Sequence, residues 1–543
     1  MYKLLEGSLI YKIIICINLW LEKGFHGSLI YRGAVAIYAF ARDIWEASLI
    51  GKGIKKAGIF IGNQWRNNRI IKRFLSPGDC KQVSDSSIIS RIWEYFHRGL
   101  NFAFRKLKLD KLLQGSIFTM PYIWSLAALA LAPFLPTMLL LAVTLVSLMT
   151  LILAFGCDSS RKLAYSPVNK YVLLFAFIYI GATFTSVTVS GSLYSGALTT
   201  LFVIFAIIIQ NSVTTKRQLY MMIYAFVLFG AAVSAYGVYQ YLSGATGATA
   251  WLDSTMFSEI GVRVYSTLDN PNVLAMYLLL VIPFAGASIL TAKGYLQKLM
   301  FTACLAIMML CMLLTFARGG WLGLIIAAAV FLVMIDRRFI IVGIVALIVL
   351  YFTLPDFILS RFLSIGNISD SSTSYRVFIW MATIEMLKDY WFTGIGPGTE
   401  AFNRIYPIYS FNTVAAPHSH NLYLQIMCNA GIAGIVVFLI CLFVYIRHLC
   451  SAISKVNRTI RIKHNGVDDS SEQISETRNG TQNVEDSAIK YARYFQIASV
   501  SSVIGFLVQG MTDYSFYNYR VTFVFWAVLG LGMLTTRLST LLD

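Results

Sequence analysis

Charged residues are scarce in this sequence of 543 residues. Asp, Glu, Lys and Arg make up 13% of the chain, whereas hydrophobic residues make up 57%. A soluble domain of this length needs roughly a quarter charged residues to cover its surface. Segments of alternating polarity are also absent, which argues against an outer-membrane barrel. The composition therefore excludes a soluble protein and indicates α-helical membrane spans.

Cysteine pairs with a motif spacing are lacking as well. None of the eight cysteines belongs to a CxxC pair or to a spacing typical of zinc sites. Most of them lie in apolar runs, where free Cys behaves as a small hydrophobic residue. The N-terminus lacks a short charged-then-apolar segment with a small-residue cleavage site, so we expect no removable signal peptide.

Long apolar runs dominate the chain from residue 117 onward, and many reach the roughly 20 residues that cross a bilayer as a helix. We predict an all-α integral membrane protein with about 12 transmembrane helices. Both termini lie inside, and a large outer loop precedes the tenth helix. The predicted spans are residues 117–133, 137–156, 170–189, 196–213, 218–242, 271–291, 297–316, 319–335, 338–354, 421–446, 490–510 and 520–537.

The charges of the connecting loops support this orientation. Every loop that it places inside carries Lys or Arg, as the positive-inside rule requires. We expect a multi-pass protein of the inner (cytoplasmic) membrane. Its polytopic domain covers residues 117–543, with an outer loop at 355–420 and a cytoplasmic insert at 447–489. Residues 464–487, rich in Asp, Glu, Ser, Asn and Thr, predict a solvated, disordered loop.

Residues 1–116 form a basic extension of different character. Up to residue 117 the chain holds 19 Lys and Arg against 8 Asp and Glu, which gives +11 of the total +18. Because this segment precedes the first span, we favour contact with anionic lipid over nucleic acid. Ser-Leu-Ile recurs at Ser8, Ser28 and Ser48. The repeat suggests short amphipathic helices on the cytoplasmic leaflet, and the alternative is a poorly structured extension.

Few cations remain on the outer side of the predicted topology, and six of the seven are arginines. They are Arg263, Arg318, Arg361, Arg376, Lys388, Arg404 and Arg520. The planar fork of Arg suits bidentate phosphate contacts, so a diphosphate ligand would explain the bias. The alternative for each is pairing with an outer carboxylate: Glu259, Asp356, Glu385 or Asp513.

Two of these arginines lie beside predicted helix starts. Arg318 precedes Gly319 and Gly320 at a tight turn, where free backbone amides and the helix dipole attract phosphate. The glycines would let a ligand approach the backbone closely. The alternative is a plain hairpin with an interfacial Arg.

The second start lies in the segment RVYSTLDNPN. Asn270 suits a helix N-cap, and Pro271 suits the first helical position. Arg263 and Asn272 offer polar contacts to a sugar or a phosphate nearby.

Only two of the six histidines, His418 and His420, fall outside. Histidine titrates near neutral pH and can take the proton of a hydroxyl group. An HxH pair can also bind a metal ion, but no third ligand has motif spacing. We therefore favour acid–base or orienting work. The glycine cluster at 394–398 lacks the Lys-Ser/Thr of a nucleotide loop and predicts a structural turn.

Together these residues resemble the bacterial O-antigen ligase/polymerase superfamily of membrane glycosyltransferases. The matching pieces are NPNVLA (270–275), ARGGWLGL (317–324), Arg376 with Trp380, GIGPG (394–398) and HSHNLYLQIMCNAGIAG (418–434). The most specific is His420-Asn421 followed, after nine residues, by Gly431-x-x-Gly434. The resemblance covers roughly residues 120–540.

The resemblance implies a reaction and its residues. The donor would be a glycan on undecaprenyl diphosphate, and the acceptor a hydroxyl of a glycan, lipid or protein at the outer face. It implies that Arg318 and Arg376 hold the diphosphate while His420 activates the acceptor. No cofactor, metal ion or nucleic acid is expected. The further residues expected to contact substrate are Arg263, Asn270, Asn272, Arg404, His418 and Asn421.

Two functions of other classes compete with this interpretation. A transporter or flippase of a lipid-linked or anionic solute would place ionisable residues in the middle of spans and show repeats with broken helices. The predicted spans are almost free of charge, which favours chemistry at the surface. A non-catalytic glycan-binding or assembly subunit is the second competitor.

Overall fold

A computed structural model of the chain describes residues 9–28, 88–113, 115–244, 263–353, 355–363, 371–411, 414–466 and 476–537, with single positions between 32 and 56. Two compact units are distinguished. The first comprises residues 1–96, 292–300 and 332–354, and the second the remainder. Within the first unit, α2 (Leu9–Gly27) is a single helix whose Asn18 Oδ1 accepts a hydrogen bond from Leu296 N at 2.8 Å. Of the repeated serines, Ser8 and Ser48 lie outside the described residues.

The described residues form helices and no strands, which confirms the all-α prediction. Each predicted span coincides with a helix or with most of one. These helices are α9 (Pro121–Leu131), α10 (Thr137–Cys157), α11 (Asn169–Phe184), α12 (Val189–Ser212), α13 (Lys216–Leu242), α14 (Pro271–Thr291), α15 (Tyr295–Leu314), α16 (Arg318–Ile335), α17 (Phe339–Thr353), α21 (Leu422–Gly466), α22 (Glu476–Gly510) and α23 (Tyr519–Thr535).

Among the described residues, seven helices are long and apolar enough to cross a bilayer: α10, α12, α13, α14, α15, α16 and α21. Four apolar helices, α9, α11, α17 and α23, are shorter. The chain is therefore a multi-pass membrane protein. The number of twelve crossings and the orientation of the termini stay predictions.

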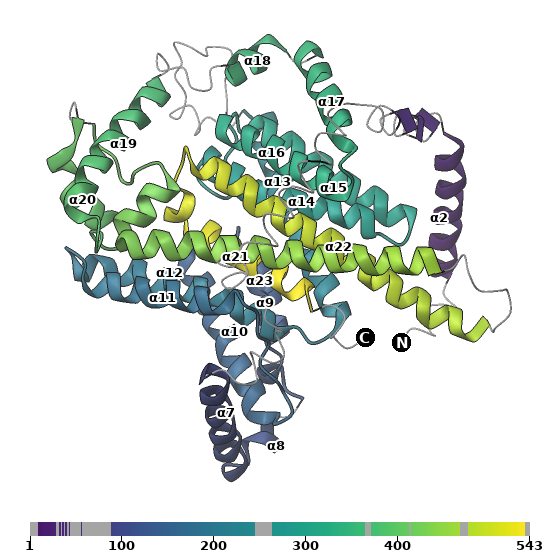
Figure 1. The fold of residues 1–543 in the computed structure, drawn as a ribbon, viewed down its shortest axis with the longest axis horizontal. Coiled ribbons are helices and arrows are strands. Elements are labelled where there is room, and N and C mark those ends of the chain that lie inside the picture. The colour runs from purple at the N-terminus through teal and green to yellow at the C-terminus, as the bar shows by residue number, and fades with distance from the viewer. Residues whose placement is uncertain are drawn as a thin grey trace. The chain divides into compact units, whose positions relative to one another are not determined.

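Helix α14 is the centre of the second unit (Figure 1). It packs against α13, α22 and α23, and most of its residues are buried. A helix that is apolar on all sides is expected in such a position. Ser502 of α22 donates a hydrogen bond to Leu280 O of α14 at 3.0 Å. The paired helices bring the start of α14 and the end of α22 to the same end of the bundle.

Helix α16 packs closely on the same two helices. A Cβ at Gly323 would lie 2.7 Å from Gly505 O of α22, and a Cβ at Gly320 would lie 2.7 Å from Ala275 Cβ of α14. Small residues at such positions let membrane helices approach closely. The start of α16 therefore joins the start of α14 and the end of α22.

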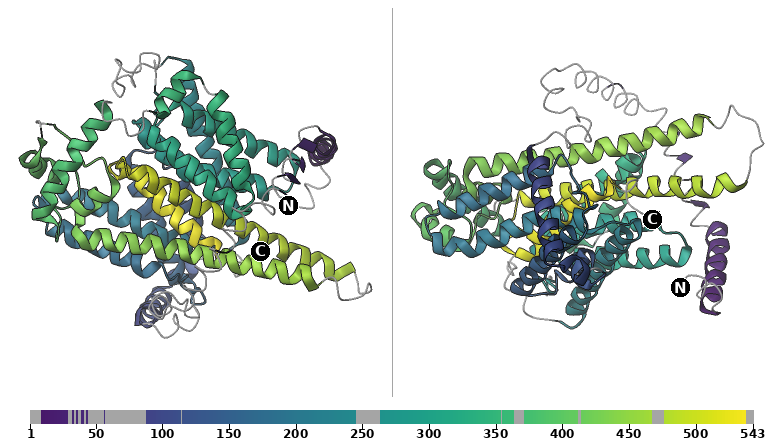
Figure 2. Two further views of the ribbon diagram at one scale, coloured as in Figure 1. Left: turned by 45° about the horizontal axis from the view of Figure 1, so that its top comes forward. Right: turned by 90° about the horizontal axis from the view of Figure 1, so that it is seen from below.

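The polar insert differs from its prediction. Helix α21 continues through residues 447–466, and α22 begins at Glu476, so most of the predicted disordered loop is helical (Figure 2). Residues 467–475 of this insert lie outside the described residues. The prediction was wrong because a polar composition argues against burial but does not prevent a segment from forming a helix. Asp, Asn, Ser and Thr are weak helix formers, so the helix here continues α21 and α22 rather than following local propensity.

The segment before α21, which was predicted as an outer loop, is also largely helical. It contains α18 (Asp356–Leu363), α19 (Ser371–Tyr390) and α20 (Thr399–Tyr409), and residues 364–370 and 412–413 lie outside the described part. Buried Ile379 and Met386 of α19 pack with Phe402 of α20 in one apolar cluster. This cluster fixes α19, which carries Arg376, against α20.

The turn at 394–398 anchors this segment to α21. Ile395 N donates to Cys428 O at 2.6 Å, and Ile432 N donates to Trp391 O at 2.8 Å. Gly431 interrupts α21 with φ 61°, and a Cβ there would collide with Phe392 O. Only glycine meets both demands easily. The predicted structural turn is confirmed. Gly431, the glycine that follows His420-Asn421 in the motif, allows this turn to pack against α21.

Candidate active site

A polar pocket lies where α14 and α16 begin and α22 ends. Its lining residues are Arg263, Asn272, Phe316, Arg318, Gly319, Ser372, Arg376, Gln509, Thr512 and Asp513. We call it the arginine pocket. It gathers four of the residues predicted from the sequence, namely Arg263, Asn272, Arg318 and Arg376. Three arginines face one carboxylate here, so the lining carries an excess of positive charge.

Arg318 is the first residue of α16 and is buried. The preceding turn is fixed by Trp321, whose Nε1 donates to Met312 O at 3.0 Å. The next residue, Gly319, also lines the pocket, and a Cβ there would lie 2.6 Å from Thr512 Oγ1. The expected guanidinium beside a helix start is therefore present. Close packing explains the two glycines as well as ligand approach does.

Arg263 is held on two sides. Its Nε donates to Thr315 O at 2.9 Å and its Nη2 to Asn272 Oδ1 at 3.1 Å. The Asn270 side chain accepts a hydrogen bond from Asn272 N at 2.8 Å, as a helix N-cap does. The predicted N-cap is thus confirmed. Gln509 Nε2 of α22 donates to Asn272 O at 2.9 Å and ties the two helices together.

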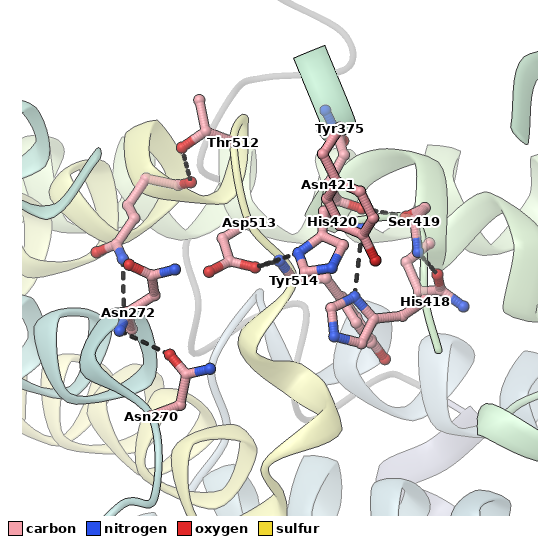
Figure 3. Close-up of polar contacts among 12 residues, drawn as sticks. Asn270, Asn272, Tyr375, His418, Ser419, His420, Asn421, Thr512, Asp513 and Tyr514 are labelled. Carbon is pink, nitrogen blue, oxygen red and sulfur yellow. Dashed lines mark hydrogen bonds and ion pairs between the residues drawn. The ribbon is translucent and has the colours of Figure 1, made fainter. Parts of the chain in front are cut away.

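His420 lies beside the pocket and is paired with a carboxylate. Its Nδ1 is 3.3 Å from Oδ1 of Asp513, and the side chains are 21% and 7% exposed (Figure 3). With the proton on Nδ1, the imidazole donates to Asp513 and its Nε2 keeps a lone pair. This arrangement suits a general base whose ring is oriented by a second group.

The electrostatics of Asp513 favour the charged form. Burial alone would raise the pKa of this carboxyl group. The hydrogen bond and positive charge of His420, together with Arg376 and His418, instead hold its pKa well below the usual range. Asp513 is therefore a carboxylate at neutral pH and can stabilise a positive charge on His420.

The backbone of His420 is fixed from several directions. The residue has φ 48°, a conformation that non-glycine residues rarely adopt. Its carbonyl accepts a hydrogen bond from Trp380 Nε1 at 3.3 Å, and its imidazole and the Tyr375 ring pack in a T-shaped arrangement. Strain of this kind persists where the surroundings determine it, and functional sites are common examples.

His418 lies in different surroundings. It is buried, its ring stacks on Tyr517 with centroids 4.7 Å apart, and its Nδ1 accepts the amide of His420 at 3.3 Å. Burial, followed by the charges of His420 and Arg376, lowers the pKa of His418 to about 3, against the influence of Asp513. His418 is therefore uncharged at neutral pH and supports the backbone of His420. Because Nδ1 of His418 already accepts a hydrogen bond, it is less available as a metal ligand, which argues against a metal site at the two histidines.

The residues next to the histidines hold the loop. Ser419 N donates to Gln425 Oε1 at 2.7 Å. The Asn421 Oδ1 accepts the amides of Tyr423 and Leu424, so this side chain caps α21, and its Nδ2 donates to Met511 O at 2.8 Å. Asn421 thus joins residues 418–421, which we call the histidine loop, to the segment that carries Asp513.

Arg404, in contrast, is exposed on α20 and is absent from the lining of the arginine pocket.

Sequence reasoning missed the role of Asp513, which it considered only as a possible partner of an outer arginine. It also missed Gln509 and Tyr375. One signal was present, because Asp513 is the only acidic residue in the short connection between the last two predicted spans. A carboxylate isolated on the predicted outer side needs a partner, and a histidine predicted on the same side is a natural one.

Comparison with known proteins supports the resemblance. No curated protein matches the chain. A family model described as O-antigen ligase matches residues 303–439, about a quarter of the chain. The range includes Arg318, Arg376 and His420 and ends before Asp513. This family indicates an enzyme of the glycosyltransferase-like ligase type. The resemblance is thereby confirmed: the chain is a multi-pass membrane protein whose residues 303–439 match the O-antigen ligase family.

Proposed function

We propose that the protein transfers an oligosaccharide or polysaccharide from undecaprenyl diphosphate to an acceptor hydroxyl at the outer face of the inner membrane. One observation carries the proposal: Asp513 lines the arginine pocket and also holds His420. A cationic pocket and an oriented base thus share one residue. A glycosyl transfer from a diphosphate needs these two elements beside each other.

In the proposed step, the acceptor hydroxyl lies near Nε2 of His420. Its oxygen attacks the anomeric carbon of the donor while its proton passes to the imidazole. The bond from the anomeric carbon to the diphosphate oxygen breaks, and the electron pair leaves with the diphosphate. A single displacement inverts the anomeric configuration.

The other side chains stabilise the charges that develop. Arg318 and Arg376 face the departing diphosphate and offset its growing negative charge. Asp513 offsets the positive charge on His420 after proton transfer. Arg263 and Asn272, which are hydrogen-bonded to each other, shape the same pocket. As the resemblance implies, the step uses neither a nucleotide sugar nor a metal ion.

The test is a transfer reaction with purified protein in lipid vesicles and undecaprenyl-diphosphate oligosaccharide as donor. Wild-type protein is compared with His420→Ala, Arg318→Ala and the control Lys388→Ala, which removes an exposed cation outside the pocket. We expect the control to match the wild-type rate and both site variants to transfer far more slowly. Equal transfer by all four proteins would refute the site.

The same reaction separates the competing functions and the acceptor classes. A ladder of products indicates a polymerase, a capped glycolipid indicates a ligase, and a modified peptide indicates protein glycosylation. Donor that crosses the vesicle membrane without forming product would favour the transporter. Binding of donor with no transfer to any acceptor would favour the assembly subunit.

A further inference from the structure

A second pocket adjoins the histidine loop, and its lining is rich in tyrosine and polar groups. Its volume is about 280 Å³, and its lining includes Thr137, Asp269, Asn270, Tyr517, Tyr519 and Arg520. We call it the tyrosine pocket. The volume is near the lower end of small-ligand pockets, roughly 300 Å³.

The charges of the tyrosine pocket are balanced. Arg520 forms an ion pair with Asp269, and its Nη1 also donates to Thr267 O at 2.6 Å. The arginine pocket, in contrast, holds three arginines against one carboxylate. A second phosphate would therefore find little net attraction in the tyrosine pocket, and a neutral polar ligand fits it better.

The lining groups suit a ligand with many hydroxyls. The tyrosine rings offer apolar surface with a polar tip. The Asp269 side chain is 78% exposed, so its carboxylate can accept hydrogen bonds beyond the ion pair. Asn270 and Thr137 add short polar side chains at two helix starts. Apolar surface beside hydrogen-bond donors and acceptors matches the alternating CH and OH groups of a sugar ring.

The tyrosine pocket is connected to both parts of the candidate active site. Asn270 of its lining accepts the amide of Asn272, which lines the arginine pocket. On the other side, Tyr517 stacks on His418, whose ring centroid lies 4.2 Å from that of His420. A glycan with its diphosphate in the arginine pocket, or with its hydroxyl at His420, therefore has this pocket within reach.

We propose that the tyrosine pocket binds a sugar unit of the glycan that takes part in the transfer. The inference rests on the proposed function and adds to it a saccharide subsite. The sugar belongs either to the donor, next to its diphosphate, or to the acceptor, next to its hydroxyl. The chemistry is the same for both, and the experiment distinguishes them.

Two substitutions alter the tyrosine pocket without changing a residue of the arginine pocket or His420. Thr137→Trp fills it from the first residue of α10. The matched control is Met138→Trp, which places the same ring at the next residue, where the side chain is 59% exposed and absent from the lining. Asp269→Asn removes a charge at φ 64°, a conformation that Asn tolerates.

The full-length protein is tested for equilibrium binding of two probes, undecaprenyl diphosphate and the same lipid carrying the oligosaccharide. Both should bind wild type, with the oligosaccharide strengthening binding if it occupies the pocket. If the bound sugar belongs to the donor, Thr137→Trp should reduce this gain in affinity by about tenfold or more. Asp269→Asn should reduce the same gain by about threefold to tenfold. Unchanged binding of undecaprenyl diphosphate shows that the variants are folded.

The acceptor is tested through its KM in the transfer reaction. For an acceptor sugar, the gain in donor binding persists in Thr137→Trp, while the acceptor KM rises by about tenfold. Met138→Trp matches wild type in both measurements. Thr137→Trp with unchanged donor gain and unchanged acceptor KM overturns the subsite. If wild type neither binds undecaprenyl diphosphate nor transfers, the proposed function itself fails.

Discussion

His418 and His420 are two residues apart and lie in contrasting surroundings. His420 is partly exposed beside the positively charged arginine pocket and is paired with Asp513. His418 is buried and stacks on Tyr517, in the lining of the charge-balanced tyrosine pocket. The contrast shows that the partner of each ring nitrogen, rather than the residue type, determines what a histidine can do.

The largest expected effect tests this contrast between the two histidines directly. His420→Ala should lower kcat by about 10²–10⁴, because the acceptor hydroxyl loses its base. His418→Gln should lower kcat far less, because this buried ring contacts no reacting atom. Steady-state transfer rates of the two purified variants test the difference. A greater loss in folded His418→Gln than in His420→Ala would reverse the assignment.

The arginine pocket should give the next largest effect. Arg318→Ala should reduce kcat by about 10²–10³, since the leaving diphosphate loses a preorganised cation. Arg318→Lys should recover only part of the rate, because Lys keeps the charge but lacks the planar fork. Rates at saturating donor measure both variants. Full activity of Arg318→Lys would show that charge alone is sufficient.

Asp513→Asn should cost about tenfold to a hundredfold in kcat, the value of a hydrogen bond to a charged group. The amide retains the shape of the carboxylate but cannot stabilise a positive imidazole. The acid limb of the pH–rate profile should also move to lower pH. An unchanged profile would indicate that Asp513 only supports the fold.

Much of the fold was predictable because apolar runs of bilayer length determine helix positions. The runs at 137–156 and 271–291 match α10 and α14 within one residue. The helical insert was not predictable from polarity, since a polar segment can form a helix when it continues two paired helices. Whether a short apolar helix such as α11 crosses the bilayer depends on packing that the sequence does not reveal.

The candidate site was predictable only in part. Arg318, Arg376 and His420 could be identified because each is an unusual residue type for its place in the topology. The sequence did not predict that these residues lie close together. It also did not predict the partner of His420, because 93 residues separate His420 from Asp513. The packing of α21 and α22 brings those two residues together. The Asn421 side chain caps α21, a role that was not predicted from the sequence, and its contact with substrate stays a prediction.

The smallest expected effect concerns stability. The pKa of His418 falls from 6.5 in its ordinary state to about 3 in the folded protein. Between these values the unfolded chain binds a proton that the folded protein does not, so stability decreases as pH falls. The slope should approach about 1.4 kcal/mol per pH unit between pH 6 and 4. The pKa of Asp513 is lowered from 3.8, so the stability that this carboxylate contributes is lost only at lower pH.

Thermal unfolding of wild type and His418→Gln between pH 6 and 4 measures the difference. His418→Gln should show a flatter dependence on pH, because Gln does not titrate. Identical slopes would mean that His418 is protonated in the folded protein, and the contrast with His420 would then disappear.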